Sequence, residues 1–197
     1  MYTRCISLFL YCLFAFQALA AGPFGFEYGM TKEQIVKLVG QRAVEKEDGD
    51  RLSLSTAPKP HPDFEAYNLM ISPEQGLVKI GAVGRDVQTT GSGYELRRAF
   101  TETADALVKS YGSAKKTYDF LESGSIWKDS QYWMMGVKKK ERHLVATWES
   151  PLPNHLQSIF LEVSALKTET GYLTLSYEFD GFKEYSDGKK AKAGSVF

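Results

Sequence analysis

The chain has 197 residues, of which 43% are hydrophobic and 13% aromatic, and its 24 Lys and Arg residues balance its 24 Asp and Glu residues. This length allows one sizeable hydrophobic core or two small fused ones. The near-neutral charge argues against nucleic acid or an anionic membrane as the main partner, because both select a basic excess.

The first 21 residues have the pattern of an export signal. Residues 1–4 form a short basic start, residues 6–16 form an apolar core, and residues 18–20 read Ala-Leu-Ala, a small-residue cleavage site. The apolar run is shorter than the roughly 20 residues of a membrane-spanning helix, which favours cleavage over a retained anchor. We therefore predict an exported protein, periplasmic or secreted and soluble, from which residues 1–21 are removed.

Both cysteines, Cys5 and Cys12, lie in the predicted signal. The bulky Tyr11 precedes Cys12, whereas a lipoprotein signal has a small residue there, so we predict that the protein is not lipidated. The mature chain would have no cysteine, which excludes disulfides and thiol catalysis. It would carry 23 basic and 24 acidic residues.

A capped helix is predicted directly after an aromatic run at residues 24–28. Thr31 can cap the first turn and Gln34 can reach back to it, and Gly40 supplies the end of the helix. The predicted apolar stripe of this helix consists of Ile35, Leu38 and Val39.

The rest of the chain alternates strand patterns with turns around one further helix. A helix is predicted over residues 94–110, where Leu96, Phe100, Thr103, Leu107 and Tyr111 recur at helical spacing before Gly112. Strands are predicted at residues 42–46, 51–56, 66–72, 77–83, 116–121, 126–137, 143–149, 156–166 and 172–179. Residues 57–62 carry three prolines and are predicted to be a stiff projecting loop, with a recognition role as the alternative. Residues 183–197 lack apolar periodicity and are predicted to be a frayed basic tail.

These patterns predict an α+β fold in which two helices pack on one face of an antiparallel sheet. Residues 22–182 would form one domain. Its two parts, residues 24–88 and 89–182, have the same outline of a helix ending in glycine, a short strand and then longer hairpin strands, which suggests a duplicated helix–strand unit. Whether the halves form one sheet or two stays open.

A short motif adds a family resemblance. Residues 29–35 followed by residues 38–40 resemble the helix-opening motif of small outer-membrane assembly lipoproteins of the SmpA/OmlA type and of the β-lactamase-inhibitor-like fold. Tyr111-Gly112 followed by a strand is similar to the second half of such proteins. The resemblance implies helices on one face of an antiparallel sheet, with the other face often used for protein binding. The chain lacks the lipidated cysteine of the lipoprotein members.

Most catalytic and metal chemistry has no sequence support. The three histidines, His61, His143 and His155, lie on three separate predicted segments, so we expect no metal site. We find no zinc-protease, serine-hydrolase, P-loop or dinucleotide motif, and we expect no cofactor. A pair of carboxylates brought together only by the fold stays possible, so enzyme activity is left open with no catalytic residue nominated.

The alternation of the last two predicted strands separates two sheet faces. Ile159, Leu161 and Val163, with Leu173, Leu175 and Tyr177, would meet the helices, whereas the intervening residues would form the opposite face. Aromatic side chains among small polar ones are typical of a protein-binding surface. The alternative is a second minor core under a loop or under the other half. The candidate partner-binding residues are Tyr132, Thr147, Phe160, Glu162, Tyr172 and Ser176.

Residues 138–142, Lys-Lys-Lys-Glu-Arg, are predicted to be a solvated hairpin turn, with electrostatic docking to an acidic partner as the alternative. Together these observations predict an exported, non-enzymatic protein-binding module. It would be inhibitor-like or immunity-like, or an envelope accessory factor, that binds another protein in the periplasm or at the cell surface. A small exported hydrolase is the alternative function.

Overall fold

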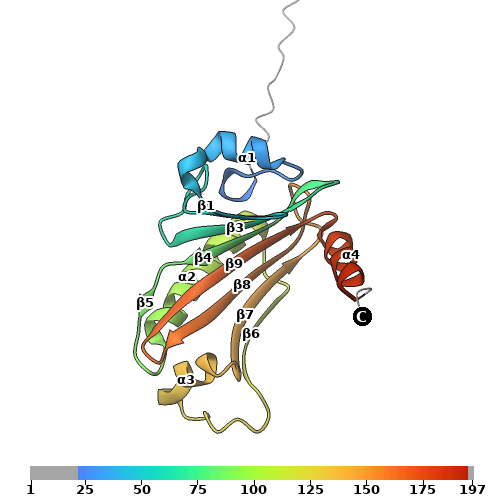
Figure 1. Cartoon of the computed structure of the whole chain (residues 1–197). Helices are drawn as coiled ribbons and strands as arrows, with labels where there is room; N and C mark the ends of the chain where they lie inside the picture. Colours follow the sequence, from blue (N-terminus) through green and yellow to red (C-terminus); the bar gives the residue numbers. More distant parts are fainter. Residues whose placement is uncertain (1–21, 195–197) are drawn as a thin grey trace, which may run out of the picture.

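The computed structural model describes residues 22–194. These residues form a nine-stranded antiparallel sheet with helices packed against it (Figure 1). Within this part the strand order is β1-β2-β3-β4-β9-β8-β7-β6, and the short β5 pairs with β9. The predicted signal, residues 1–21, lies outside the described residues.

The strands are β1 (Val44–Asp48), β2 (Arg51–Leu54), β3 (Phe64–Ser72), β4 (Gly76–Gly84), β5 (Val87–Gln88), β6 (Lys116–Leu121), β7 (Arg142–Glu149), β8 (Leu156–Lys167) and β9 (Thr170–Phe179). The α-helices are α1 (Lys32–Val39), α2 (Tyr94–Tyr111), α3 (Trp133–Lys138) and α4 (Phe182–Gly194). Single-turn 3-10 helices occupy Pro23–Gly25 (η1), Gln41–Ala43 (η2) and Ser130–Tyr132 (η3). The α+β class is confirmed, but the described residues form four α-helices, whereas the sequence predicts two.

The predicted cap of α1 is present. The Thr31 N–H donates to Gln34 Oε1 at 2.9 Å, and the Gln34 N–H donates to Thr31 Oγ1 at 3.3 Å, so two free N–H groups of the first turn are satisfied. Of the predicted apolar stripe, Ile35 is fully buried and Val39 is half-buried. The prediction is wrong for Leu38, which is 52% exposed.

The two halves of the chain share one connectivity. Each has a helix followed by four antiparallel strands: α1 precedes β1 to β4, and α2 precedes β6 to β9, with α3 inserted between β6 and β7. Both helices end at a glycine with a φ of 82°, Gly40 and Gly112, whose N–H bonds back to the helix. The last strands of the two halves, β4 and β9, pair at the middle of the sheet and join it into one. The duplication itself stays a prediction.

One face of the sheet, called here the core face, carries the hydrophobic core. Its strand residues include Leu69, Ile80, Leu161, Leu175 and Tyr177, and α2 and α3 pack over β7, β8 and β9 on this face. The buried stripe of α2 is Leu96, Phe100 and Leu107, as the helical spacing predicts. The core runs across both halves of the sheet. The ring of Phe24, for example, packs edge-on against Tyr67 and Tyr177 at centroid distances of 5.0 and 5.8 Å.

The segment at residues 126–137, predicted to be a strand, instead ends in η3 and α3. A short apolar run fits either a strand or a buried helix. Trp133, Met134 and Val137 are buried together because they share the inner side of the α3 turn over the core face. Two contacts hold this turn in place: Trp133 Nε1 donates to the Asp119 carboxylate at 3.0 Å, and the Met134 N–H donates to the Gly91 carbonyl at 2.9 Å.

The tail is the second correction, because residues 182–194 form α4 in place of a frayed segment. Its side chains find partners on the sheet. Tyr185 and Lys189 both bond to the Asp50 carboxylate, and Lys79 Nζ lies 4.6 Å from the centre of the Phe182 ring. These tertiary contacts supply what the weak amphipathic pattern lacks, since protein helices are stabilised mainly by packing. Lys79 and its cross-strand neighbour Glu178 alternate with core residues, so α4 lies on the face opposite the core (Figure 1).

Candidate functional site

The sheet face opposite the core face, called here the open face, brings together several predicted site residues. The strand register aligns Lys116, Thr147, Phe160, Ser176 and Gly81 in one row across five strands, β6, β7, β8, β9 and β4. Thr147, Phe160 and Ser176 are therefore direct cross-strand neighbours. Glu162 and Tyr172 lie on the same face of β8 and β9, as the alternation predicts.

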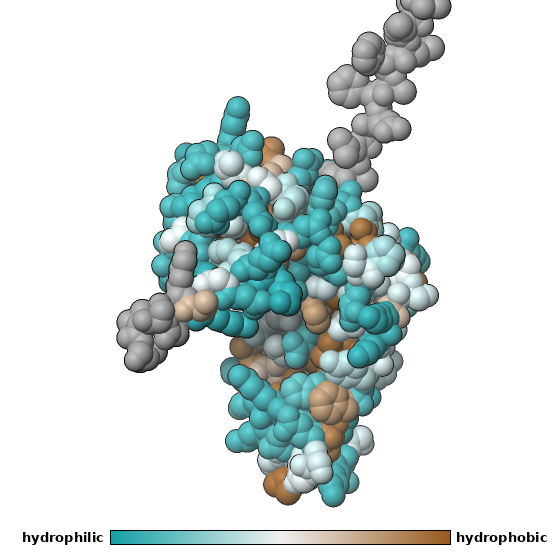
Figure 2. Space-filling view, turned by 90° about the vertical axis from the view of Figure 1, so that its right-hand side faces the viewer, coloured by the Kyte–Doolittle hydropathy of each residue, from teal (hydrophilic) through white to brown (hydrophobic). Residues whose placement is uncertain are grey.

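Exposed aromatic rings concentrate at the β6 end of this face. Tyr118, Phe120 and Phe160 are 39%, 45% and 38% exposed. The Tyr118 and Phe120 rings lie 5.4 Å apart, and Phe120 stacks on His143 at 4.9 Å. These four side chains are called here the aromatic patch. Figure 2 views the α4 side of the molecule and shows apolar side chains reaching the surface among hydrophilic ones in its lower half.

The floor of the aromatic patch is well packed. Val145 and Thr147 of β7 are 8% and 6% exposed, although they belong to the open face. Thr147 Oγ1 is buried and has no hydrogen-bond partner among the described residues.

Helix α4 limits the other end of the open face. Lys79 Nζ donates to Glu178 at 2.8 Å, Ser158 Oγ donates to the same carboxylate at 2.8 Å, and the Phe182 ring covers Lys79. These polar groups satisfy one another beneath the helix. The open face is therefore closed near β4 and β9 and accessible near β6, β7 and β8.

A basic hollow adjoins the aromatic patch. It has a volume of about 380 Å³ and is lined by residues that include Lys138, Lys140, His143, Glu162 and Tyr172. Lys138 and Lys140 form no ion pair with any described residue. His143 lies between two carboxylates, 3.5 Å from Glu122 and 3.9 Å from Glu162. The hollow thus offers lysine ammonium groups beside exposed aromatic rings, a combination that suits an acidic protein surface.

Tyr132 does not belong to this site. It is the last residue of η3 and precedes α3, and its ring lies edge-on to Trp127 at 6.0 Å, off the sheet. The expectation that Tyr132 joins Thr147 on one sheet face is wrong because residues 126–137 do not form a strand.

Three members of the aromatic patch were missed by the sequence analysis. The strand at residues 116–121 is predicted with its observed bounds, and its alternation already puts Lys116, Tyr118 and Phe120 on one face. That alternation was the available signal. The pairing of this face with His143 depends on the β6–β7 register, for which the sequence carries no comparable signal.

No protein-family model, curated protein or solved structure matches this chain.

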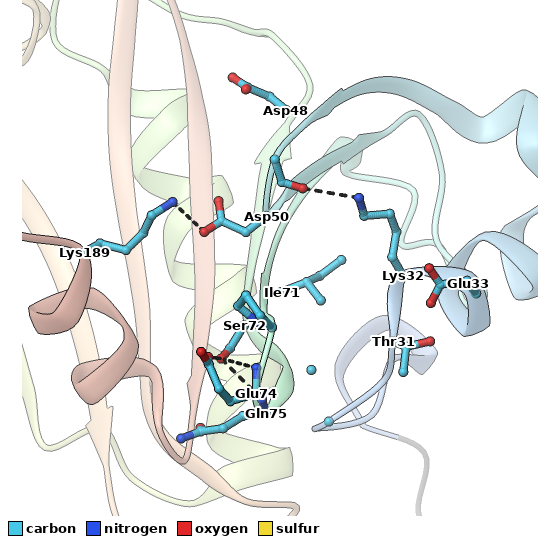
Figure 3. Close-up of a pocket in the computed structure, with 14 residues that line it drawn as sticks. Thr31, Lys32, Glu33, Asp48, Asp50, Ile71, Ser72, Glu74, Gln75 and Lys189 are labelled. Atoms are coloured by element: carbon cyan, nitrogen blue, oxygen red, sulfur yellow. Dashed lines mark hydrogen bonds and ion pairs between the residues drawn. The ribbon is translucent and has the colours of Figure 1, made fainter. Parts of the chain in front are cut away.

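A larger pocket lies elsewhere, between the start of α1, the β1–β2 turn, the β3–β4 turn and α4 (Figure 3). Its volume is about 870 Å³. Its charged groups mostly satisfy one another: Lys32 bonds to Glu47 and to the Gly49 carbonyl, and Asp50 bonds to Lys189 and Tyr185.

Two acid groups of this pocket, Asp50 and Glu33, do not have the character of a general acid. Although partial burial opposes it, hydrogen bonds from Lys189 and Tyr185 hold the pKa of Asp50 below its usual value. Backbone N–H donors at the start of α1, with Thr31, lower the pKa of Glu33. A catalytic general acid instead needs a raised carboxyl pKa. Across residues 22–194, no three His, Cys, Asp or Glu side chains converge as metal ligands would.

A search of the described helices finds none that is both long and apolar enough to cross a membrane.

Proposed function

We propose that this protein is an exported, non-enzymatic binding module that captures another protein in the periplasm or at the cell surface through the aromatic patch. The observation that carries the proposal is the presence of three partly exposed aromatic rings, Tyr118, Phe120 and Phe160, on an accessible sheet face beside unpaired lysines. Exposed aromatic clusters of this kind are enriched at protein interfaces and supply most of their binding energy.

The chemistry of the site defines the partner. The rings would bind an apolar side chain of the partner, buried among them, and Lys138 and Lys140 would pair with carboxylates of the partner close to that side chain. A partner with an apolar protrusion flanked by Asp or Glu meets both demands. An inhibitor-like or immunity-like protein, or an envelope accessory factor, would have such a partner. Export is part of the proposal and rests on the signal pattern of residues 1–21.

No observation on the described residues favours the alternative function, a small exported hydrolase, and we do not propose it. The Asp50 carboxylate, which lines the pocket between α1 and α4, is engaged with Lys189 and Tyr185 of the protein itself.

The test is affinity capture from an envelope extract with the wild-type chain and with the double variant Phe160→Ala/Tyr172→Ala. Loss of two aromatic contacts at an interface weakens binding by at least about 2 kcal/mol, or roughly 30-fold in Kd. We expect one dominant captured protein that the double variant loses. The Kd of the purified pair then gives the size of the effect, and it should rise with salt because Lys138 and Lys140 contribute.

The matched control is Leu38→Ala/Tyr94→Ala, which likewise truncates two large apolar side chains. Leu38 on α1 is 52% exposed and Tyr94 on α2 is 59% exposed, and neither lies on the open face. Capture by this control should equal that of the wild type. Equal capture by a folded Phe160→Ala/Tyr172→Ala protein would refute the assignment of the open face.

A further inference from the structure

Strand β6 ends the sheet, and its outer edge is free. Within the described residues β6 pairs with β7 alone, and all of its residues are exposed or half-exposed. An edge strand presents a row of unpaired N–H and C=O groups that can pair with another chain. β6 is regular over six residues and contains neither proline nor a bulge, two of the devices that block such pairing. Of its two charged residues, Lys116 finds an opposite charge in the pairing described below, and Asp119 is paired with Arg142 of its own chain.

The hydrogen-bond pattern shows which residues present these free groups. The Glu122 N–H donates to the Glu141 carbonyl at 2.7 Å, which makes this pair a bonded pair of the antiparallel ladder. Bonded pairs alternate along such a ladder, so Lys116, Tyr118 and Phe120 also direct their backbone groups toward β7. The backbone N–H and C=O groups of Thr117, Asp119 and Leu121 therefore point away from the sheet.

This outer edge is complementary to itself. In an antiparallel pair of two β6 strands with Asp119 opposite Asp119, Thr117 and Leu121 face one another and complete the bonded pairs. On the open face, Tyr118 then lies opposite Phe120, and Lys116 lies opposite Glu122. Cross-strand aromatic pairs and opposite charges are the combinations that stabilise antiparallel strands.

We propose that the protein forms a homodimer in which β6 pairs antiparallel with β6 of a second copy about a two-fold axis at Asp119. The two sheets become one continuous sheet, and the two aromatic patches meet across the axis. The proposal concerns self-association and does not depend on the proposed partner.

The opposed Asp119 carboxylates do not prevent this pairing. Each Asp119 already accepts hydrogen bonds from Arg142 Nη1 at 2.9 Å and from Trp133 Nε1 at 3.0 Å within its own chain, so its charge is compensated. The register shifted by two residues, with Tyr118 opposite Tyr118, is poorer. It places Lys116 opposite Phe120, leaves Glu122 without a partner and loses the bonded pairs of Leu121.

The test is sedimentation equilibrium of the chain without its signal peptide over a range of concentrations. We expect the wild type to be a dimer in the micromolar range. Thr117→Pro should be monomeric, because its lost N–H points outward and the β6–β7 ladder does not use it. Thr117→Ala keeps the N–H and is the matched control, so it should remain a dimer. Circular dichroism checks that Thr117→Pro is folded.

Charge exchange tests the register. Lys116→Glu alone places one glutamate opposite Glu122 of the partner copy at each of the two symmetry-related positions, and Glu122→Lys alone places two lysines opposite each other at each position. Each single variant should weaken the dimer about tenfold, because two surface ion pairs of several tenths of a kcal/mol are each replaced by a repulsion of similar size. An equimolar mixture of the two variants restores both opposite-charge pairs and should recover wild-type affinity.

A monomeric wild type, a Thr117→Pro protein as dimeric as Thr117→Ala, or a mixture with no recovery would each overturn the proposal. Phe160→Ala leaves the β6 edge intact and should remain dimeric. Failure of partner capture and failure of dimerisation are thereby separate results.

Discussion

Gly93 and Gly112 flank α2, and both have a positive φ, 68° and 82°. They differ in their surroundings. A Cβ added at Gly93 would overlap the Trp133 ring, whereas a Cβ at Gly112 would meet nothing within 4 Å. Gly93 therefore combines a left-handed backbone with close packing against α3, whereas Gly112, with a φ of 82° and a ψ of −174°, meets only a backbone requirement.

We predict that Gly93→Ala lowers the free energy of unfolding by about 3 kcal/mol, since left-handed strain of about 1–2 kcal/mol adds to an overpacking cost of similar size. Gly112→Ala should cost about 2 kcal/mol, from backbone strain alone, because its φ of 82° and ψ of −174° lie in a region nearly reserved for glycine. Urea unfolding followed by tryptophan fluorescence measures both values. A loss at Gly93→Ala of only about 1 kcal/mol, the left-handed strain alone, would show that the contact with Trp133 contributes nothing.

The sequence could not predict this role of Gly93. In the sequence, Gly91-Ser92-Gly93 is a flexible connection to α2, and local turn chemistry explains a glycine there. The close contact arises only because residues 133–138 form α3 and bring Trp133 against the start of α2. The capping box of Thr31 and Gln34 is purely local, and the sequence predicts it correctly.

At the level of elements, the sequence predicts correctly those helices and strands whose pattern is local, and it misses those that depend on contacts with distant parts of the chain. The strands at residues 116–121, 143–149, 156–166 and 172–179 are predicted to within two residues, because alternation is written into the strand itself. Helices α3 and α4 are missed because their helical form depends on partners distant in sequence. The open-face residues of β7, β8 and β9 follow the alternation. Tyr132 does not belong to the site, because the strand predicted at residues 126–137 does not form.

Helix α4 is held by the Asp50 carboxylate, and this attachment should depend on pH. The hydrogen bonds from Lys189 and Tyr185 hold the pKa of Asp50 below its usual 3.8. A lowered carboxyl pKa stabilises the docked helix above the usual pKa and loses this effect as pH falls through the lowered value. Bonds to Asp50 raise the pKa of Lys189. The pKa of Tyr185 is also raised, mainly by burial and then by its hydrogen bond to Asp50. Docking is therefore also lost at high pH, as each group deprotonates.

We predict that hydrogen-exchange protection of residues 182–194, corrected for the intrinsic pH dependence, is highest between about pH 4 and pH 10 and falls outside that range. Asp50→Asn should reduce the protection several-fold at neutral pH, because the amide cannot hold the Lys189 charge. Asp48→Asn is the control, since Asp48 lines the same pocket but contacts neither Lys189 nor Tyr185. If protection changed neither with pH nor in Asp50→Asn, the contacts of Asp50 would not hold α4, and only the contacts at its Phe182 end would.

At the scale of the whole molecule, the two halves share one core. Ile80 of β4 lies opposite Tyr177 of β9, and Phe24, at the start of the described chain, packs on Tyr177 as well. The strand patterns could predict two four-stranded sets but not the β4–β9 junction, because nothing in the pattern of one strand specifies a partner so far along the chain. The junction decides that the open face is one surface.

We predict from this shared core that the two halves unfold together. The chain has three tryptophans, Trp127, Trp133 and Trp148, and all belong to the second half. Tryptophan fluorescence therefore reports on the second half, whereas far-ultraviolet circular dichroism reports on both. In urea the two signals should give one coincident transition, as expected when no intermediate is populated. A circular dichroism curve with a second step, absent from fluorescence, would mean that β1 to β4 unfold separately and that the β4–β9 junction does not couple the halves.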